Sequence, residues 1–348
     1  MQLPLWNSLA PGRDAYVPKW VMHDLLREKG ARRWWRTNGA VTSLQHRDGG
    51  IIKPLEAFPE HAADESAFGA LMEHCYARGI VRPPSYADMF HQLYDTPRIR
   101  WSANAQFFGL FSGGWQEAKI RGVARGRWKV YDIRSAYLWS LSHGLPDPRT
   151  FRFSRAPQFG DVSGDCKPGL YVVELARPCN LPYPFNRHTR TLHLASTDEI
   201  TTYDLPISRY HFGLTWSRTL SAAYMVDLIQ SFPCAKNIAR GFWGRWASHA
   251  ATETVMANGK TWSMRNPALN VVWAHVIVSR VKMRIWREAM NAAHIFVDAI
   301  ITQDDLPMGT QPGDWRFVAE YPDGIEILGP GIYGIPGGEL AKHAGRVL

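Results

Sequence analysis

The chain has 348 residues, enough for one large domain or two modest ones, and its composition is typical of a globular protein, with 45% hydrophobic and 20% charged residues. Forty Lys and Arg against 31 Asp and Glu leave a formal net charge of +9, which favours a polyanionic partner, nucleic acid first. The four cysteines form no C-x-x-C pair, so neither a zinc ribbon nor a redox dithiol is indicated.

The hydropathy pattern argues against a membrane protein. No window approaches about 18 uninterrupted apolar residues, and the first residues, MQLPLWNSLAPGRDAY, lack the apolar core of a signal peptide. Scattered cysteines fit a reducing compartment. We therefore expect a cytoplasmic protein, in a host cell if the source is viral, with no membrane partner.

Residues 1–106 carry a basic, Trp-bearing stretch, LREKGARRWWRTNG, and a helical pattern around SAFGALMEHCYARG. The Arg and Trp residues could hold a nucleic-acid backbone and stack on bases. The alternative is a helix with Trp inward and Arg outward, which we favour here. The region is expected to be partly helical, and its role is not indicated.

From about residue 107 the pattern changes to short strands and longer helices. GRWKVYDI and GLYVVELARP predict buried strands, and AKNIARGFWGRWASHA predicts a helix with Pro233 near its first turn. A long helix is predicted from about Pro267 to Asn291, followed by strands at HIFVDAII and DWRFVAEY. Strands packed with these helices predict an α+β core.

Two of the predicted strands each contain a single acid, Asp132 in RWKVYD and Asp298 in HIFVDAII. A lone carboxylate in an apolar strand costs free energy unless it is paired or neutralised. Two neighbouring strands with one Asp each could bind Mg²⁺, which takes one or two carboxylates together with water and substrate phosphates. For either acid alone, a strand-end or turn role is the simpler interpretation.

The predicted helix over 233–249 places Lys236, Arg240 and Trp243 at i, i+4 and i+7, on one face. A Lys and an Arg on one face suit a triphosphate, because the point charge and the planar fork both stabilise negative oxygens. A solvated basic face with a core Trp is the alternative.

The order of these segments resembles family B DNA polymerases, particularly the protein-primed kind found in phages and linear plasmids. The family's first motif, D-x-x-S-L-Y-P, is matched by DIRSAYL, which begins at Asp132 and includes Ser135 and Tyr137. SGGWQEAKIRG is similar to the Gly-Gly segment that precedes that motif. The second motif, K-x-x-x-N-S-x-Y-G, is matched by KNIARGFWG, from Lys236 to Gly244.

The third motif, Y-x-D-T-D-S, falls on HIFVDAII. One register places Asp298 on the second, metal-binding aspartate and Phe296 on the first. The other places Asp298 on the first aspartate and Ile300 on the second. We prefer the first register because AIIT continues it naturally. ILGPGIYGI resembles the K-x-Y segment at the primer terminus, with Tyr333 kept and Gly331 in place of the lysine.

The resemblance implies a polymerase palm, an antiparallel sheet with packed helices, and short helical fingers. It predicts an N-terminal region over 1–106, palm segments over 107–220 and 267–348 with a short C-terminal tail, and fingers over 221–266. Residues 1–106 show no D-x-E exonuclease pattern, and 15 residues follow Tyr333. We therefore expect a minimal form without exonuclease or thumb.

The resemblance also implies nucleotidyl transfer, with two Mg²⁺ or Mn²⁺ ions held by Asp132 and Asp298. The expected partners are template and primer DNA, deoxynucleoside triphosphates and a priming or clamp protein. The residues expected to contact the nucleotide are Lys236, Arg240, Tyr137, Ser135, Trp243 and Gly244. The residues expected to contact nucleic acid are Tyr333, Arg245 and Arg134.

Three other functions stay open. A primase-like enzyme would use the same site without a primer. A catalytically inactive palm that binds nucleic acid or a replication partner is favoured by the altered motif positions, because function resides in the site and not in the fold. A nuclease could use the same two carboxylates, although a Lys and an Arg on one helix suit a triphosphate better.

Overall fold

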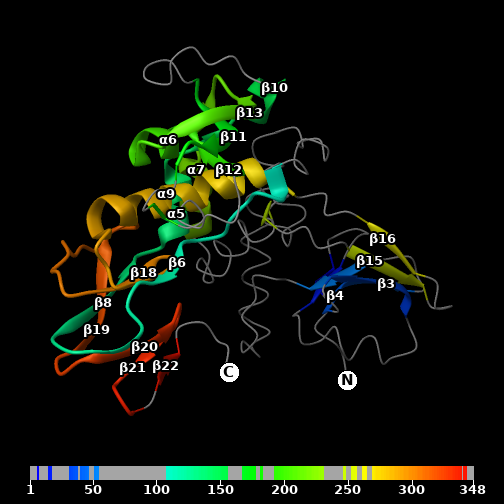
Figure 1. Cartoon of the computed structure of the whole chain (residues 1–348). Coiled ribbons are helices and arrows are strands. Elements are labelled where there is room, and N and C mark those ends of the chain that lie inside the picture. Colours follow the sequence, from blue (N-terminus) through cyan, green and yellow to red (C-terminus); the bar gives the residue numbers. More distant parts are fainter. Residues whose placement is uncertain are drawn as a thin grey trace, which may run out of the picture. The chain divides into compact units, whose positions relative to one another are not determined.

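The computed structural model describes residues 107–155, 167–177, 181–182, 192–230, 246–247 and 269–338, together with the backbone of short strands elsewhere (Figure 1). The chain divides into two compact units, each made of two separate stretches. Met1–Asn104 joins Tyr224–Asn270, and Ala105–Ala223 joins Val271–Leu348. The assignment of these stretches to palm and fingers stays a prediction.

The first unit contains a seven-stranded sheet in the order β1-β2-β5-β4-β3-β15-β16. The strands are β1 (Trp6–Asn7), β2 (Ala15–Val17), β3 (Ala31–Thr37), β4 (Ala40–His46), β5 (Ile51–Pro54), β15 (Thr252–Met256) and β16 (Thr261–Met264). Strands from residues 1–106 and 221–266 thus share one sheet. The range 221–266, where short helical fingers are expected, therefore includes the strands β15 and β16.

The expectation of a helix over the Arg/Trp stretch is wrong. Residues 31–37, ARRWWRT, form strand β3, which pairs with β4 on one side and β15 on the other. Trp and Thr favour extended backbone, and two neighbouring strands satisfy the backbone N–H and C=O groups. The helical stretch expected around 66–79 lies outside the described residues.

The second unit is built around a five-stranded antiparallel sheet in the order β19-β8-β18-β17-β6 (Figure 1). Its strands are β6 (Gln116–Ala118), β8 (Trp128–Ile133), β17 (His294–Phe296), β18 (Ala299–Thr302) and β19 (Trp315–Tyr321). HIFVDAII, expected to be one strand, is instead the hairpin β17–β18, with a two-residue turn at Val297 and Asp298. The run contains no Gly, Asn or Pro, so its composition did not indicate a turn.

Two further sheets and several short elements complete the second unit. One sheet has the order β10-β13-β11-β12, and the other β22-β21-β20-β7. Their strands are β10 (Arg152–Arg155), β13 (Ile207–Thr215), β11 (Gly169–Leu175), β12 (Leu192–Ser196), β22 (Leu340–Lys342), β21 (Ile332–Gly334), β20 (Ile325–Gly329) and β7 (Gly122–Ala124). The remaining elements are β9 (Leu145–Pro146), β14 (Thr219–Leu220), η1 (Pro148–Thr150), α5 (Ala136–Ser142), α6 (Thr197–Tyr203) and α7 (Ala223–Gln230). The fold class is α+β with antiparallel sheets, as the sequence predicted.

Helix α9 (Val271–Ala289) packs against both the five-stranded sheet and the four-stranded sheet that contains β11 and β12. Val281 and Ile285 pack with Tyr131 of β8 and Ile300 of β18. Met283 packs with the cluster that covers β11 and β12. The helix is therefore buried along most of its length, and it fixes β8 and β18 from one side.

Polar side chains of α9 are buried as pairs. His275 Nε2 lies 2.6 Å from Glu199 Oε2, and Lys282 Nζ donates to Ser112 Oγ at 2.9 Å. Burial raises the pKa of Glu199, but His275 and Lys282 outweigh this effect, so the pKa is lowered and the carboxylate is charged. Burial lowers the pKa of Lys282 to about 8, although Glu199 opposes that shift. No helix in the described part of the chain is long and apolar enough to cross a membrane.

The lowered pKa of Lys282 predicts a pH-dependent stability. Between pH 8 and 10.5 the unfolded state binds a proton that the folded state does not, so the free energy of unfolding should rise with pH, by up to about 3 kcal/mol. Lys282→Met should remove this part of the rise. Urea unfolding of the parent and the variant at several pH values from 7 to 10.5 measures the free energy of unfolding of each. An equal rise with pH in both proteins would contradict the attribution of the rise to Lys282.

Candidate active site

Asp132 is the penultimate residue of β8, which lies between the edge strand β19 and the central strand β18 of the five-stranded sheet. Its direct cross-strand neighbours are Ala299 on β18 and Arg316 on β19. The carboxylate is 23% exposed, and its Oδ2 lies 2.5 Å from Nη2 of Arg316. An accessible carboxylate therefore stands at this edge of the sheet, with a guanidinium as its present counter-charge.

Asp298 lies in the turn of the β17–β18 hairpin, beside the end of β8. Its carbonyl oxygen accepts a hydrogen bond from the N–H of Ile133 at 2.9 Å. Asp298 immediately precedes Ala299, the residue that pairs with Asp132 across β8 and β18. The structure thus brings the two predicted acids to the same end of adjacent strands, and both are partly exposed.

The hairpin turn is strained and is supported from behind. Val297 has φ +65°, a conformation that β-branched residues rarely adopt. Its N–H donates to the carbonyl of Trp115 at 2.7 Å. A Cβ added to Gly114 would lie 2.7 Å from Cγ1 of Val297, so only glycine fits there without displacing the turn. Gly114 belongs to the predicted Gly-Gly segment, and it positions the turn that carries Asp298.

Two positions that depart from the family pattern contact each other. Phe296 stands where the first aspartate of the third motif is expected, and Gly331 where the lysine of K-x-Y is expected. A Cβ at Gly331 would meet the Phe296 ring at 3.0–3.2 Å, and Gly331 has φ +77°. The ring therefore occupies space that a side chain at residue 331 would need.

The remaining residues of the first motif form the connection from β8 to α5. Ser135 is exposed, with φ 44° and ψ 44°, and it precedes the first residue of the helix. Tyr137 lies in the first turn and is half-buried. Arg134 Nε donates to the carbonyl of Gly309 at 2.8 Å and so holds the loop before β19. The nucleotide and nucleic-acid roles of these residues stay predictions.

Tyr333 lies on β21 in a buried cluster. Its ring is 3% exposed and contacts His294 and Tyr321, with centroids 5.6 and 6.1 Å away. Burial raises the pKa of the phenol, and Tyr321 and the carboxylate of Asp132 add to the shift. The phenol is therefore within electrostatic reach of Asp132, and its contact with nucleic acid stays a prediction.

The proposed triphosphate-binding helix is not tested by the structure. Five predicted residues lie outside the described part of the chain: Lys236, Arg240, Trp243, Gly244 and Arg245. Arg316, which faces Asp132, was not identified from the sequence. Its strand, DWRFVAEY, was predicted, but nothing in the pattern indicated which cross-strand neighbour it would meet.

The two carboxylates fit a divalent metal ion in their chemistry. No group of three or more His, Cys, Asp and Glu side chains gathers among the described residues. Asp132 and Asp298 are carboxylates, and Mg²⁺ is commonly bound by one or two carboxylates in sites that water and substrate phosphates complete. The ion pair with Arg316 shows that the carboxylate of Asp132 stabilises a positive charge at this position.

Comparison with solved structures shows a polymerase-like fold. Phi29 DNA polymerase bound to primer-template DNA aligns with a TM-score of 0.60 and 11% identity, over 95% of this chain and 83% of the polymerase. Its complex with single-stranded DNA gives a TM-score of 0.62 and 12% identity, over 95% and 80%. No protein-family model and no curated protein matches the sequence. At 11–12% identity, this structural similarity shows a shared fold and nothing more specific.

The contact between Gly114 and Val297 predicts the effect of adding one methyl group. Gly114→Ala should displace the hairpin turn, lower the free energy of unfolding by about 1–3 kcal/mol, and move Asp298. Gly113→Ala is the matched control, because no atom lies within 4 Å of the position that its added Cβ would take. Thermal unfolding of both variants checks the prediction, and equal losses would contradict it.

Proposed function

We propose that this chain is a template-directed DNA polymerase or nucleotidyltransferase of the protein-primed family B type. One observation carries the proposal. The hairpin β17–β18 brings Asp298 beside the end of β8, where Asp132 lies, in a fold similar to that of phi29 DNA polymerase. Phi29 DNA polymerase is the protein solved with primer-template DNA and incoming nucleotides, and these are the partners proposed for this chain.

In this proposal Asp132 and Asp298 hold two Mg²⁺ or Mn²⁺ ions. Such ions, when bound, activate the primer 3′-hydroxyl and neutralise the leaving pyrophosphate. If Asp132 held a metal ion, its ion pair with Arg316 would be broken, and the guanidinium would be available to the negative charge of the triphosphate. Tyr137 packs against the sugar and excludes a 2′-hydroxyl, which selects deoxynucleotides.

The other predicted residues complete the proposed site. Lys236 and Arg240 bind the triphosphate, and Trp243 and Gly244 lie against the nascent base pair. Arg134, Arg245 and Tyr333 contact the primer and template. Short synthesis or priming in phage or plasmid replication, aided by a priming or clamp protein, fits the minimal set of motifs.

Two observations favour a second candidate, a catalytically inactive palm that binds nucleic acid or a replication partner. Phe296 replaces a carboxylate in the third motif and packs against Gly331. Arg316 already neutralises Asp132 without any metal. An inactive protein of this kind would bind nucleic acid with the same fold, but it would not incorporate nucleotides.

Incorporation of labelled deoxynucleotides on primed and unprimed templates separates the two candidates. With Mg²⁺ or Mn²⁺ the parent protein should extend a primer, and Asp132→Asn and Asp298→Asn should each lower the rate by about a hundredfold or more. Asp298→Asn keeps the main-chain hydrogen bond to Ile133, so the hairpin remains.

Asp323→Asn, at an exposed turn of the same unit, is the matched control and should leave the rate unchanged. Binding of DNA by the parent protein without incorporation on any template would support the inactive palm. Incorporation without a primer would indicate a primase-like enzyme.

The ion pair between Asp132 and Arg316 predicts a change in the metal requirement. Arg316→Gln removes the cation that competes for the carboxylate, so the Mg²⁺ concentration for half-maximal incorporation should fall about two- to fivefold, as expected for a partly exposed ion pair. Titration of Mg²⁺ in the extension assay measures it, with Arg121→Gln as a control for net charge. A higher Mg²⁺ requirement in Arg316→Gln would refute this competition.

A further inference from the structure

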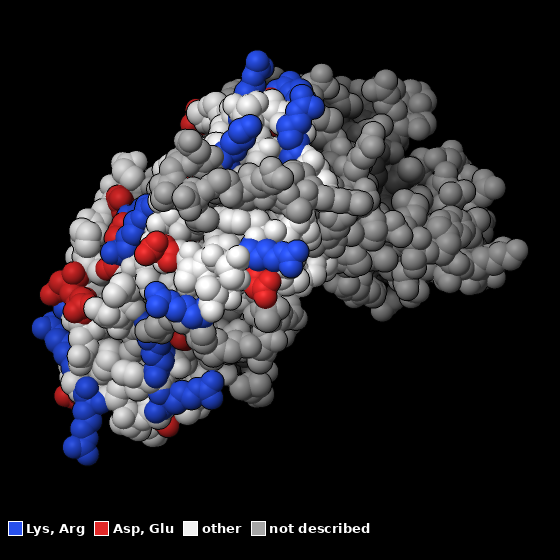
Figure 2. All heavy atoms as spheres, turned by 45° about the horizontal axis from the view of Figure 1, so that its top comes forward, with Lys and Arg blue, Asp and Glu red and all other residues white. Residues whose placement is uncertain are grey.

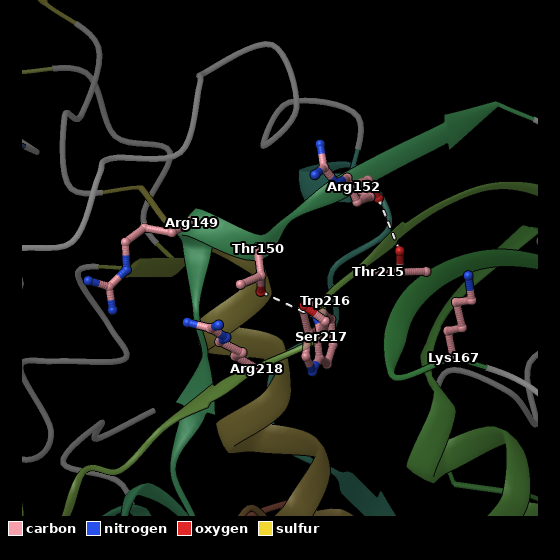
Figure 3. A pocket seen from close by; sticks show the side chains of 8 residues that line it. All are labelled: Arg149, Thr150, Arg152, Lys167, Thr215, Trp216, Ser217 and Arg218. Atoms are coloured by element: carbon pink, nitrogen blue, oxygen red, sulfur yellow. Dashed lines mark hydrogen bonds between the residues drawn. The ribbon is translucent and has the colours of Figure 1, made fainter.

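A hollow with a volume of about 310 Å³ lies at the ends of β10, β11 and β13, away from the five-stranded sheet (Figure 3). Its wall includes four cations, a Trp and hydroxyl groups. The cations are Arg149, Arg152, Lys167 and Arg218. Trp216 lies between Arg149 and Arg218 at one end and Lys167 at the other (Figure 3). None of these residues takes part in the proposed polymerase site.

Backbone hydrogen bonds hold the wall of this hollow. Thr215 pairs with Arg152 across β13 and β10, and its hydroxyl donates to the carbonyl of Arg152 at 3.4 Å. The N–H of Trp216 donates to the carbonyl of Pro168 at 3.0 Å, and the N–H of Ser217 donates to Thr150 Oγ1 at 3.3 Å. The strand ends and η1 therefore set the spacing of the cations and of the indole.

Three of the four cations form no ion pair with any acid among the described residues. Arg149 donates to both carboxylate oxygens of Asp147, at 2.9 and 3.0 Å. Arg152, Lys167 and Arg218 are exposed and form no direct ion pair within the described ranges, and Arg218 acts on Asp147 only through a longer-range charge interaction that helps to lower its pKa. Lys and Arg side chains gather at this end of the described surface, with few Asp or Glu among them (Figure 2).

Several cations elsewhere in this unit face acids directly. Ion pairs join Arg127 to Glu320, Lys129 to Asp305 and Arg284 to Glu288. Among the described residues, four cations around the single carboxylate of Asp147 leave a net positive charge at the hollow, and a bound polyanion relieves the remaining repulsion. A cluster of this kind, arranged around an aromatic ring, matches the combination that binds single-stranded nucleic acid.

We propose that this hollow binds a single strand of nucleic acid. Arg152, Lys167 and Arg218 contact successive phosphates of the backbone, and the indole of Trp216 stacks on an unpaired base. The strand must be single there, because a base paired in a duplex does not offer its face to a side chain. This binding does not depend on catalysis by Asp132 and Asp298.

Fluorescence anisotropy with a labelled 12-residue oligo(dT), without metal or nucleotide, tests the proposal on the full chain. The triple variant Arg152→Gln/Lys167→Gln/Arg218→Gln should bind at least tenfold more weakly at 100 mM salt. The slope of log K against log[salt] should become shallower by about 2, because about 0.7 of a counter-ion is released per phosphate contact on a single strand. Trp216→Leu should weaken binding about tenfold with little change in that slope.

The triple variant Arg121→Gln/Arg125→Gln/Arg209→Gln removes the same charge from exposed positions elsewhere in this unit and should keep its affinity and slope within about twofold of the parent. Equal losses in both triple variants, or equal affinity for duplex of the same length, overturn the proposal. So does displacement of the oligonucleotide by equimolar deoxynucleoside triphosphate or inorganic phosphate, since the ligand would then be a free phosphate compound. Asp132→Asn should bind like the parent, so loss of polymerase activity and loss of strand binding are separable.

Discussion

Burial of helix α9 between two sheets is the constraint on which this unit depends. Val281 and Ile285 hold β8 and β18 in place, and Met283 packs toward β11 and β12. The buried polar groups of such a helix need hydrogen-bond partners, and the contacts of His275 with Glu199 and of Lys282 with Ser112 supply them. With the helix fixed, the ends of β8 and β18 are fixed too, and the candidate site stands on rigid elements.

The departures from the family pattern are physically coupled. The Phe296 ring lies against Gly331, so a side chain at residue 331 would require the ring to move. The remaining acids, Asp132 and Asp298, keep partial exposure, and Arg316 balances Asp132.

Much of this fold was predictable from hydrophobic periodicity. The strands at RWKVYDI and DWRFVAEY and the long helix after Pro267 follow the predicted segments, because strong alternation or a long 3.6-residue period leaves few other solutions. The errors fell where local pattern and tertiary contacts disagree. β3 is a strand because β4 and β15 pair with it, and Val297 turns at φ +65° because Trp115 and Gly114 hold it there.

The sequence by itself determined the α+β class, the two separate acids and the order of the motifs, since these depend on residue type and local spacing. Only the tertiary structure decided that Asp298 lies in a turn beside Asp132, and that Arg316 faces that carboxylate. It also gathered the cations around Trp216 from segments far apart in the chain. Strand pairing and register place such residues together, and both arise from contacts between distant segments.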